Sequence, residues 1–240
     1  MIFAGIKSKS QECSLELQLM DHLFRTYVKP DYTEHTLSTA KQLLLQTRSG
    51  RQGFLRITLP PIWDQAAHQM EYDTIANVKV LWINKHLRSN GIIMSFHGGA
   101  YVSGSAESCL PYLVPLTRDT NMSGLSVHYS LSPEVILPQQ VNEAFNIYQY
   151  LLTEMNMNAK QITLVGDSAG GSLVILLIQK LIKQQEYGDK LPLCAVTLSS
   201  WDVPSNGDSY TKNRDTDSLM DDKTGQIWGY FAVGNVDFDG

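Results

Sequence analysis

A serine lies between glycines where the chain reads Gly166-Asp167-Ser168-Ala169-Gly170-Gly171. A serine that attacks a carbonyl carbon needs an exposed hydroxyl on a sharp turn between a strand and a helix. Glycine or another small residue on each side of the serine allows the strained backbone conformation of such a turn. The pattern G-x-S-x-G is weak by itself, because an ordinary Gly-Ser turn or a phosphate-binding turn can open a helix too. Here it follows an apolar run at 162–165 and precedes an apolar helical pattern. The context predicts that this segment (the elbow, residues 166–171) carries a nucleophile, Ser168.

A second glycine-rich segment reads His97-Gly98-Gly99-Ala100-Tyr101 (the glycine loop, residues 97–101). Successive glycines let backbone N–H groups point into a cavity. Such donors stabilise the oxyanion of a tetrahedral intermediate, and the loss of one raises the barrier by about 2.7–4 kcal/mol. The N–H of Ala169, at the start of the helix after Ser168, is a further candidate donor. We interpret His97 as a support for the loop through hydrogen bonds, in preference to a general base.

Hydrophobic patterns predict strands that alternate with helices. The predicted strands cover residues 53–59, 78–83, 92–96, 125–129, 162–165 and 193–198. The predicted helices cover residues 12–28, 36–47, 138–153 and 171–184. Continuous apolar strands that alternate with helices imply a mostly parallel sheet with helices on both faces. In such sheets the chemistry gathers at the carboxyl ends of the strands, where both glycine-rich segments begin.

Composition excludes several classes of function. The 240 residues suit one α/β domain. The net charge is −5 and the sequence contains no cluster of basic residues, which argues against nucleic acid as a partner. The three cysteines are far apart, so we expect neither a metal site nor a disulfide framework, and no cofactor. No apolar stretch reaches the roughly 18–20 residues of a membrane span, and we expect no signal peptide.

Together these motifs resemble the hormone-sensitive-lipase-like branch of the α/β-hydrolases, which includes arylacetamide deacetylases and fungal steryl acetate deacetylases. The resemblance covers roughly residues 75–235. The matching segments are the glycine loop, the elbow, YSLSPE at 129–134, Pro138, Glu143-Ala144, and SSWD at 199–202, which is similar to the family's Ser-Pro-Trp segment. The resemblance implies an α/β-hydrolase fold, with residues 51–240 as an incomplete hydrolase domain. Residues 1–50 would form a helical, cap-like segment, or equally a simple packing element.

The resemblance also implies roles for individual residues. Ser168 would be the nucleophile, and Gly98, Gly99 and Ala169 would donate to the oxyanion. Ala100 replaces the third glycine of the family's loop and keeps an N–H group. Glu134 would anchor its loop without taking part in catalysis. The expected activity is hydrolysis of lipophilic acetyl or short-acyl esters, with steryl acetates among them, through an acyl-enzyme.

In this fold the nucleophile is followed along the chain by an acid and then a histidine. All histidines of this chain precede Ser168: His22, His35, His68, His86, His97 and His128. We therefore expect a fold that lacks its last strands and a chain with impaired turnover. A non-catalytic homologue that binds a small ligand and an inert remnant that folds poorly are the alternatives.

Two further expectations concern partners and location. The strand at 193–198 would expose an apolar edge, which favours self-association. Relatives suggest the endoplasmic reticulum, but this sequence leaves the location open.

Overall fold

The structure is a computed structural model that describes residues 18–19, 21–22, 25, 31–32, 35–58, 69–184, 190–201, 208–213, 215–217 and 219–234. Within these residues the strands form one six-stranded sheet in the order β1-β2-β4-β3-β5-β6. The strands are β1 (Met70–Ile75), β2 (Val78–Ile83), β3 (Ile92–Phe96), β4 (Ser123–His128), β5 (Ile162–Asp167) and β6 (Cys194–Leu198). The β1–β2 and β2–β4 pairs are antiparallel, and the other three pairs are parallel. The mostly parallel sheet predicted from the sequence is confirmed.

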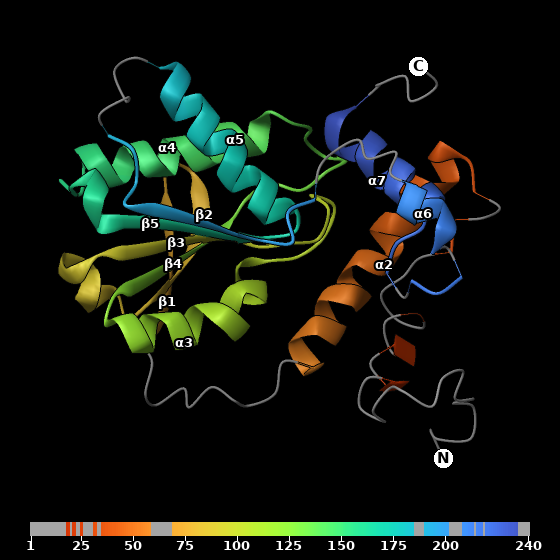
Figure 1. The fold of residues 1–240 in the computed structure, drawn as a ribbon, viewed down its shortest axis with the longest axis horizontal. Coiled ribbons are helices and arrows are strands. Elements are labelled where there is room, and N and C mark those ends of the chain that lie inside the picture. The colour runs from red at the N-terminus through yellow and green to blue at the C-terminus, as the bar shows by residue number, and fades with distance from the viewer. Residues whose placement is uncertain are drawn as a thin grey trace.

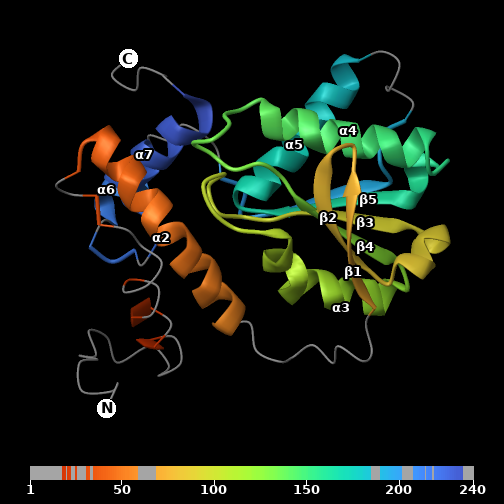
Figure 2. The same ribbon diagram turned by 180° about the vertical axis from the view of Figure 1, so that it is seen from behind.

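Helices cover both faces of this sheet. The α-helices are α2 (Leu37–Thr58), α3 (Leu110–Thr120), α4 (Gln139–Thr153), α5 (Ala169–Lys183), α6 (Asp208–Lys212) and α7 (Asp222–Val233). Short 3-10 helices are η3 (Lys85–Asn90), η4 (Ala106–Cys109) and η5 (Ala159–Gln161). Helices α4 and α5 pack on one face and α3 on the other (Figures 1 and 2). Helices α2, α6 and α7 gather on the side where β3 and β5 end, so they lie over the loops that carry the predicted chemistry (Figure 1).

The central strand β3 determines where the glycine loop begins. All five of its residues are buried, as a continuous apolar run in the middle of a parallel sheet requires. It lies between β4 and β5, and its register pairs Phe96 with Gly166. The chain therefore leaves β3 beside the point where it leaves β5, and the glycine loop starts next to the elbow.

The N-terminal half of the chain differs from the predicted pattern. The predicted helix at 36–47 is confirmed as the first part of α2, but the predicted strand at 53–59 is wrong, because α2 continues to Thr58. A short alternation of apolar residues cannot by itself distinguish a strand from a helix. Helix α2 also runs through position 50, the predicted boundary of the cap-like segment. The predicted helix at 12–28 lies largely outside the described residues.

Strand β1 was not predicted. Its sequence MEYDTI has polar residues at three of six positions, and only Ile75 is buried, so it lacks the continuous apolar face of a half-buried strand. It turns into β2 through Ala76 and Asn77, both with positive φ, at 49° and 65°. Hairpins with two positive-φ turn residues usually carry Asn-Gly or Asp-Gly, and Ala-Asn gives no comparable signal.

Strand β6 lies where it was predicted, at one edge of the sheet. It pairs in parallel with β5, and each of its residues is exposed, with Val196 at 43% and Leu198 at 42%. No other strand of the described part of the chain pairs with its outer edge. Pairing of this edge with another chain remains a prediction. A search of the described helices for a segment long and apolar enough to span a membrane finds none.

Helix α5 offers a direct test of the core. Leu177 is fully buried, whereas Ile182 on the same helix is 57% exposed. We expect Leu177→Ala to lower the free energy of unfolding by about 2–5 kcal/mol through loss of apolar burial and a cavity. Ile182→Ala should change it by no more than about 0.5 kcal/mol. Urea denaturation of both variants measures the difference, and equal effects would contradict this packing of α5.

Candidate active site

Ser168 occupies the turn between β5 and α5 in a strained backbone conformation. Its φ is 51° and its ψ is −120°, values that cost a residue with a side chain about 1–3 kcal/mol. Hydrogen bonds hold the turn: the N–H of Ser168 donates to the carbonyl of Leu198 (2.8 Å), and its carbonyl accepts from the N–H of Trp201 (3.1 Å) and of Gly171 (2.9 Å). The end of β6 and the start of α5 thus fix the serine from both sides.

Close backbone approaches explain two glycines of the elbow. A Cβ at Gly166 would lie 2.1 Å from the carbonyl oxygen of Gly170. A Cβ at Gly170 would lie 2.1 Å from the carbonyl oxygen of Phe96. In both cases the obstacle is backbone, which cannot move aside as a flexible side chain can. The elbow therefore tolerates no larger residue at these positions.

The glycine loop turns through three successive residues with positive φ: Gly99 at 114°, Ala100 at 53° and Tyr101 at 61°. The carbonyl of Gly99 accepts hydrogen bonds from the N–H groups of Val102 (2.9 Å) and Ser103 (3.0 Å), which close the turn.

Three backbone N–H groups of the glycine loop and the elbow have no hydrogen-bond acceptor within the described part of the chain. Within the part of the chain that the structure describes, no acceptor hydrogen-bonds the N–H groups of Gly99, Ala100 or Ala169. The N–H of Gly98, in contrast, donates to Oδ1 of Asp167 at 2.9 Å. Of the predicted oxyanion donors, Gly99 and Ala169 thus have free N–H groups, and Gly98 is engaged.

His97, the first residue of the glycine loop, is fully buried. Its Nδ1 hydrogen-bonds the carbonyl of Gly98 at 2.7 Å, and its ring stacks on that of Tyr129 with 4.1 Å between centroids. The hydroxyl of Tyr129 donates to the carbonyl of His97 at 2.7 Å. Burial lowers the pKa of His97 to about 4, so the ring is neutral at pH 7.

The segment at 129–134 is anchored by two carboxylates. Glu143 is buried and accepts hydrogen bonds from the backbone N–H (2.8 Å) and the hydroxyl (2.7 Å) of Ser130. Glu134 forms a two-pronged ion pair with Arg48 of α2, at 2.7 and 3.1 Å. Arg48 also donates to the carbonyl of Ser132 at 2.5 Å. The anchor predicted at Glu134 therefore joins this segment to α2, a contact that no sequence pattern indicated.

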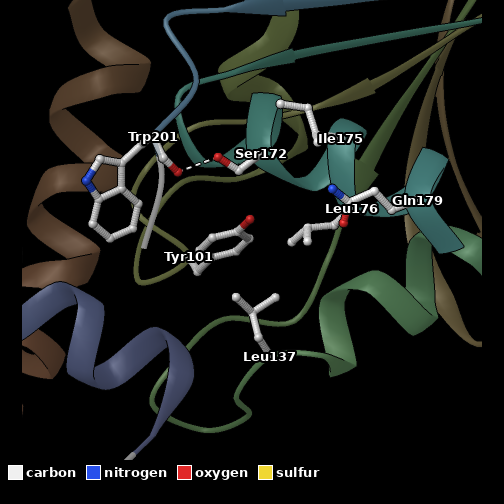
Figure 3. Close-up of a pocket in the computed structure, with 7 residues that line it drawn as sticks. All are labelled: Tyr101, Leu137, Ser172, Ile175, Leu176, Gln179 and Trp201. Carbon is white, nitrogen blue, oxygen red and sulfur yellow. Dashed lines mark hydrogen bonds between the residues drawn. The ribbon is translucent and has the colours of Figure 1, made fainter. Parts of the chain in front are cut away.

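A small cavity lies beside the elbow, between α5, Tyr101 of the glycine loop and Trp201, which follows β6 (Figure 3). Its volume is about 160 Å³. The lining is mostly apolar and consists of Tyr101, Leu137, Ser172, Ile175, Leu176, Gln179 and Trp201. The hydroxyl of Ser172 donates to the carbonyl of Trp201, as the dashed line in Figure 3 shows. The indole N–H of Trp201 donates to the hydroxyl of Tyr210 in α6 at 3.1 Å, which links the elbow to that helix.

The hydroxyl of Ser168 has no acidic or basic hydrogen-bond partner within the described part of the chain. Among the described side chains, none hydrogen-bonds the hydroxyl of Ser168. A search of the described residues for groups of three or more metal-ligating side chains also finds none. The site thus presents a strained serine and free N–H donors.

Comparison with known proteins agrees with this geometry. Residues 93–239 match the family described as alpha/beta hydrolase fold. The chain belongs to that family. It is 30% identical to an acetyl-hydrolase of Streptomyces hygroscopicus over 62% of this chain and 48% of that protein. It is 26% identical to an esterase of Acinetobacter venetianus over 82% of this chain and 64% of that protein. The chain therefore spans about half to two thirds of the length of these relatives.

The resemblance to hormone-sensitive lipases is confirmed. Human hormone-sensitive lipase is 32% identical over 44% of this chain, which corresponds to 10% of that protein. The crystal structure of an esterase from the bacterial hormone-sensitive lipase family superposes with a TM-score of 0.71 at 25% identity, and covers 94% of this chain and 71% of that one. The chain is therefore a hormone-sensitive-lipase-like α/β-hydrolase.

The close approach at Gly166 predicts a large effect of one methyl group. Gly166→Ala should lower the free energy of unfolding by about 1–3 kcal/mol or more, because the new Cβ meets backbone atoms of the elbow. The matched control is Gly225→Ala within α7, where the nearest atom would be Cε1 of Tyr210 at 3.3 Å. That exchange should leave stability within about 1 kcal/mol, since alanine suits a helix better than glycine. Urea denaturation midpoints compare the two, and a harmless Gly166→Ala would refute this elbow geometry.

Burial of His97 predicts a loss of stability in acid. In the unfolded chain His97 titrates near its ordinary pKa of 6.5, and in the folded chain near 4. Between these values the unfolded state binds a proton that the folded state excludes, so this contribution to stability falls as pH falls from 6.5 to about 4. Unfolding free energies at pH 7.5 and 5 should differ less in His97→Asn than in the parent chain. The exposed His86→Asn is the control, and a His97→Asn variant with the parent's pH dependence would show that His97 titrates normally.

Proposed function

We propose that this chain carries the nucleophile and the oxyanion donors of a serine carboxylic-ester hydrolase. The observation that carries the proposal is the backbone of Ser168, held at φ 51° on a turn between a parallel strand and a helix. Free N–H groups of Gly99 and Ala169 lie in the two segments that meet there. A strained, preorganised serine beside unpaired backbone donors suits acyl transfer.

In the proposed reaction, the Oγ of Ser168 attacks the ester carbonyl and its proton passes to a base. The N–H groups of Gly99 and Ala169, with that of Ala100, donate to the oxyanion that forms. The N-terminal end of α5 adds a favourable dipole. The intermediate then expels the alcohol, which takes up the proton from that base, and water hydrolyses the acyl-enzyme to release the acid and restore the hydroxyl of Ser168. Gly98 would have to leave Asp167 before it could join these donors.

The proposed substrates are lipophilic acetyl or short-acyl esters, with steryl acetates among them. The similarity to an acetyl-hydrolase supports a small acyl group. The cavity of about 160 Å³ beside the elbow has a mostly apolar lining. A cavity of about 150 Å³ is large enough to hold benzene, so a short chain or a small ring would fit here.

We further propose that these 240 residues by themselves turn substrate over negligibly. A serine hydroxyl without a base is a weak nucleophile, and loss of a triad member costs several powers of ten in rate. No described side chain hydrogen-bonds the hydroxyl of Ser168, and no histidine follows it in the sequence. The same observation favours a second candidate function, the binding of a small apolar ester or acid without its conversion.

A fluorophosphonate probe tests these proposals. We expect slow covalent labelling of the parent chain and of Ser89→Ala, an exchange at an exposed serine, because the oxyanion donors act there without a base, and no labelling of Ser168→Ala. Fast labelling that Ser168→Ala abolishes would show that another group serves as the base. Turnover of p-nitrophenyl acetate should stay near the uncatalysed rate for all three. Robust turnover that Ser168→Ala abolishes would contradict the proposed impairment. A parent chain that melts cooperatively and binds the ester, but is neither labelled nor active, would favour the binding function.

A further inference from the structure

We propose that Asp167 is a positioning residue of this site, whose carboxylate holds the glycine loop beside Ser168 through the N–H of Gly98. The inference rests on the proposed function, because it concerns the placement of the oxyanion donors. Asp167 is the variable residue in the pattern G-x-S-x-G, and that pattern assigns it no role.

The geometry brings the carboxylate to the base of the glycine loop. Oδ1 of Asp167 accepts a hydrogen bond from the N–H of Gly98 at 2.9 Å. Asp167 ends β5 and Gly98 follows β3, and the parallel register of these strands places the two residues side by side. A hydrogen bond to a charged acceptor is shorter and stronger than one between neutral groups. The bond thus connects the residue before the nucleophile to the loop that carries the donors.

The requirement for glycine at position 98 follows from this contact. A Cβ there would lie 2.3 Å from Oδ2 of Asp167 and 3.2 Å from Cβ of Ser168. Gly99 needs its positive φ of 114°, whereas Gly98 is constrained by the carboxylate that occupies the space of its absent side chain. The carboxylate of Asp167 therefore both accepts a hydrogen bond from Gly98 and fills the space where a side chain at position 98 would lie.

A third element meets the same carboxylate. The hydroxyl of Tyr112 in α3 lies 3.4 Å from Oδ1 of Asp167 and 2.8 Å from the hydroxyl of Ser95 in β3. Burial raises the pKa of Asp167, and its hydrogen bonds with Gly98 and Tyr112 oppose that rise. The carboxylate thus joins the elbow, the glycine loop and α3.

The consequence concerns Gly99 and Ala100, which follow Gly98 and carry free N–H groups. Without the bond to Asp167, the start of the loop is no longer fixed relative to Ser168. A displacement of about 1 Å at a reacting centre can cost about a hundredfold in rate. Asp167 acts on the reaction only through the position of these donors.

The test uses Asp167→Asn and Asp167→Ala in the full chain, with Asp119→Asn at an exposed, ion-paired aspartate as the matched control. The first readout is the amide proton resonance of Gly98, which a charged acceptor shifts to low field. We expect it to move to higher field in part in Asp167→Asn and fully in Asp167→Ala, and to stay in place in Asp119→Asn. The second readout is the rate of fluorophosphonate labelling at Ser168, which should fall about tenfold or more in Asp167→Ala and less in Asp167→Asn.

The Gly98 resonance and the labelling rate together test the proposed role of Asp167. An unmoved Gly98 resonance in Asp167→Asn and Asp167→Ala would overturn it, as would a moved resonance with an unchanged labelling rate. If Asp167→Ala does not fold, Asp167→Asn decides, since it keeps the shape of the side chain and removes its charge. If the parent chain is not labelled, the proposed nucleophile fails, and the Gly98 resonance alone then supports or overturns the role of Asp167.

Discussion

The strained turn at Ser168 is the constraint on which the rest of the site depends. A residue with a side chain does not adopt its φ of 51° and ψ of −120° unless the surroundings impose them. Here the carbonyl of Leu198 and the N–H of Trp201 bond the serine from one side, and the first turn of α5 bonds it from the other. The strain of about 1–3 kcal/mol is therefore offset by the packing of β5, β6 and α5, which holds the turn in place.

The parallel alignment of β3 and β5 is the second requirement. Because Phe96 lies opposite Gly166, the two glycine-rich segments leave the sheet at the same height and on the same edge. A Cβ at Gly170 would strike the carbonyl of Phe96, so the elbow and the end of β3 are in direct contact. A one-residue slip in this register would turn side chains to the opposite face and separate the loops.

Distant parts of the chain complete the surroundings of the site. Arg48 of α2 reaches the segment at 129–134 through Glu134, and Tyr32 accepts a hydrogen bond from the indole N–H of Trp228 in α7 at 3.3 Å. Trp201 connects the elbow to α6 through Tyr210. These contacts place helices from both ends of the described chain over the carboxyl edge of the sheet (Figure 2).

The sequence by itself determined the elements whose signal is local. Continuous apolar runs predicted β3 and β5, and a G-x-S-x-G pattern between a strand and a helix predicted the elbow around Ser168, because both depend on neighbours along the chain. The extent of α2 and the existence of β1 were beyond such reasoning, since short segments with mixed polarity suit either a helix or a strand until packing selects one. Only the tertiary structure decided that the N–H of Gly98 faces Asp167, because that contact depends on the register of two strands far apart in the sequence.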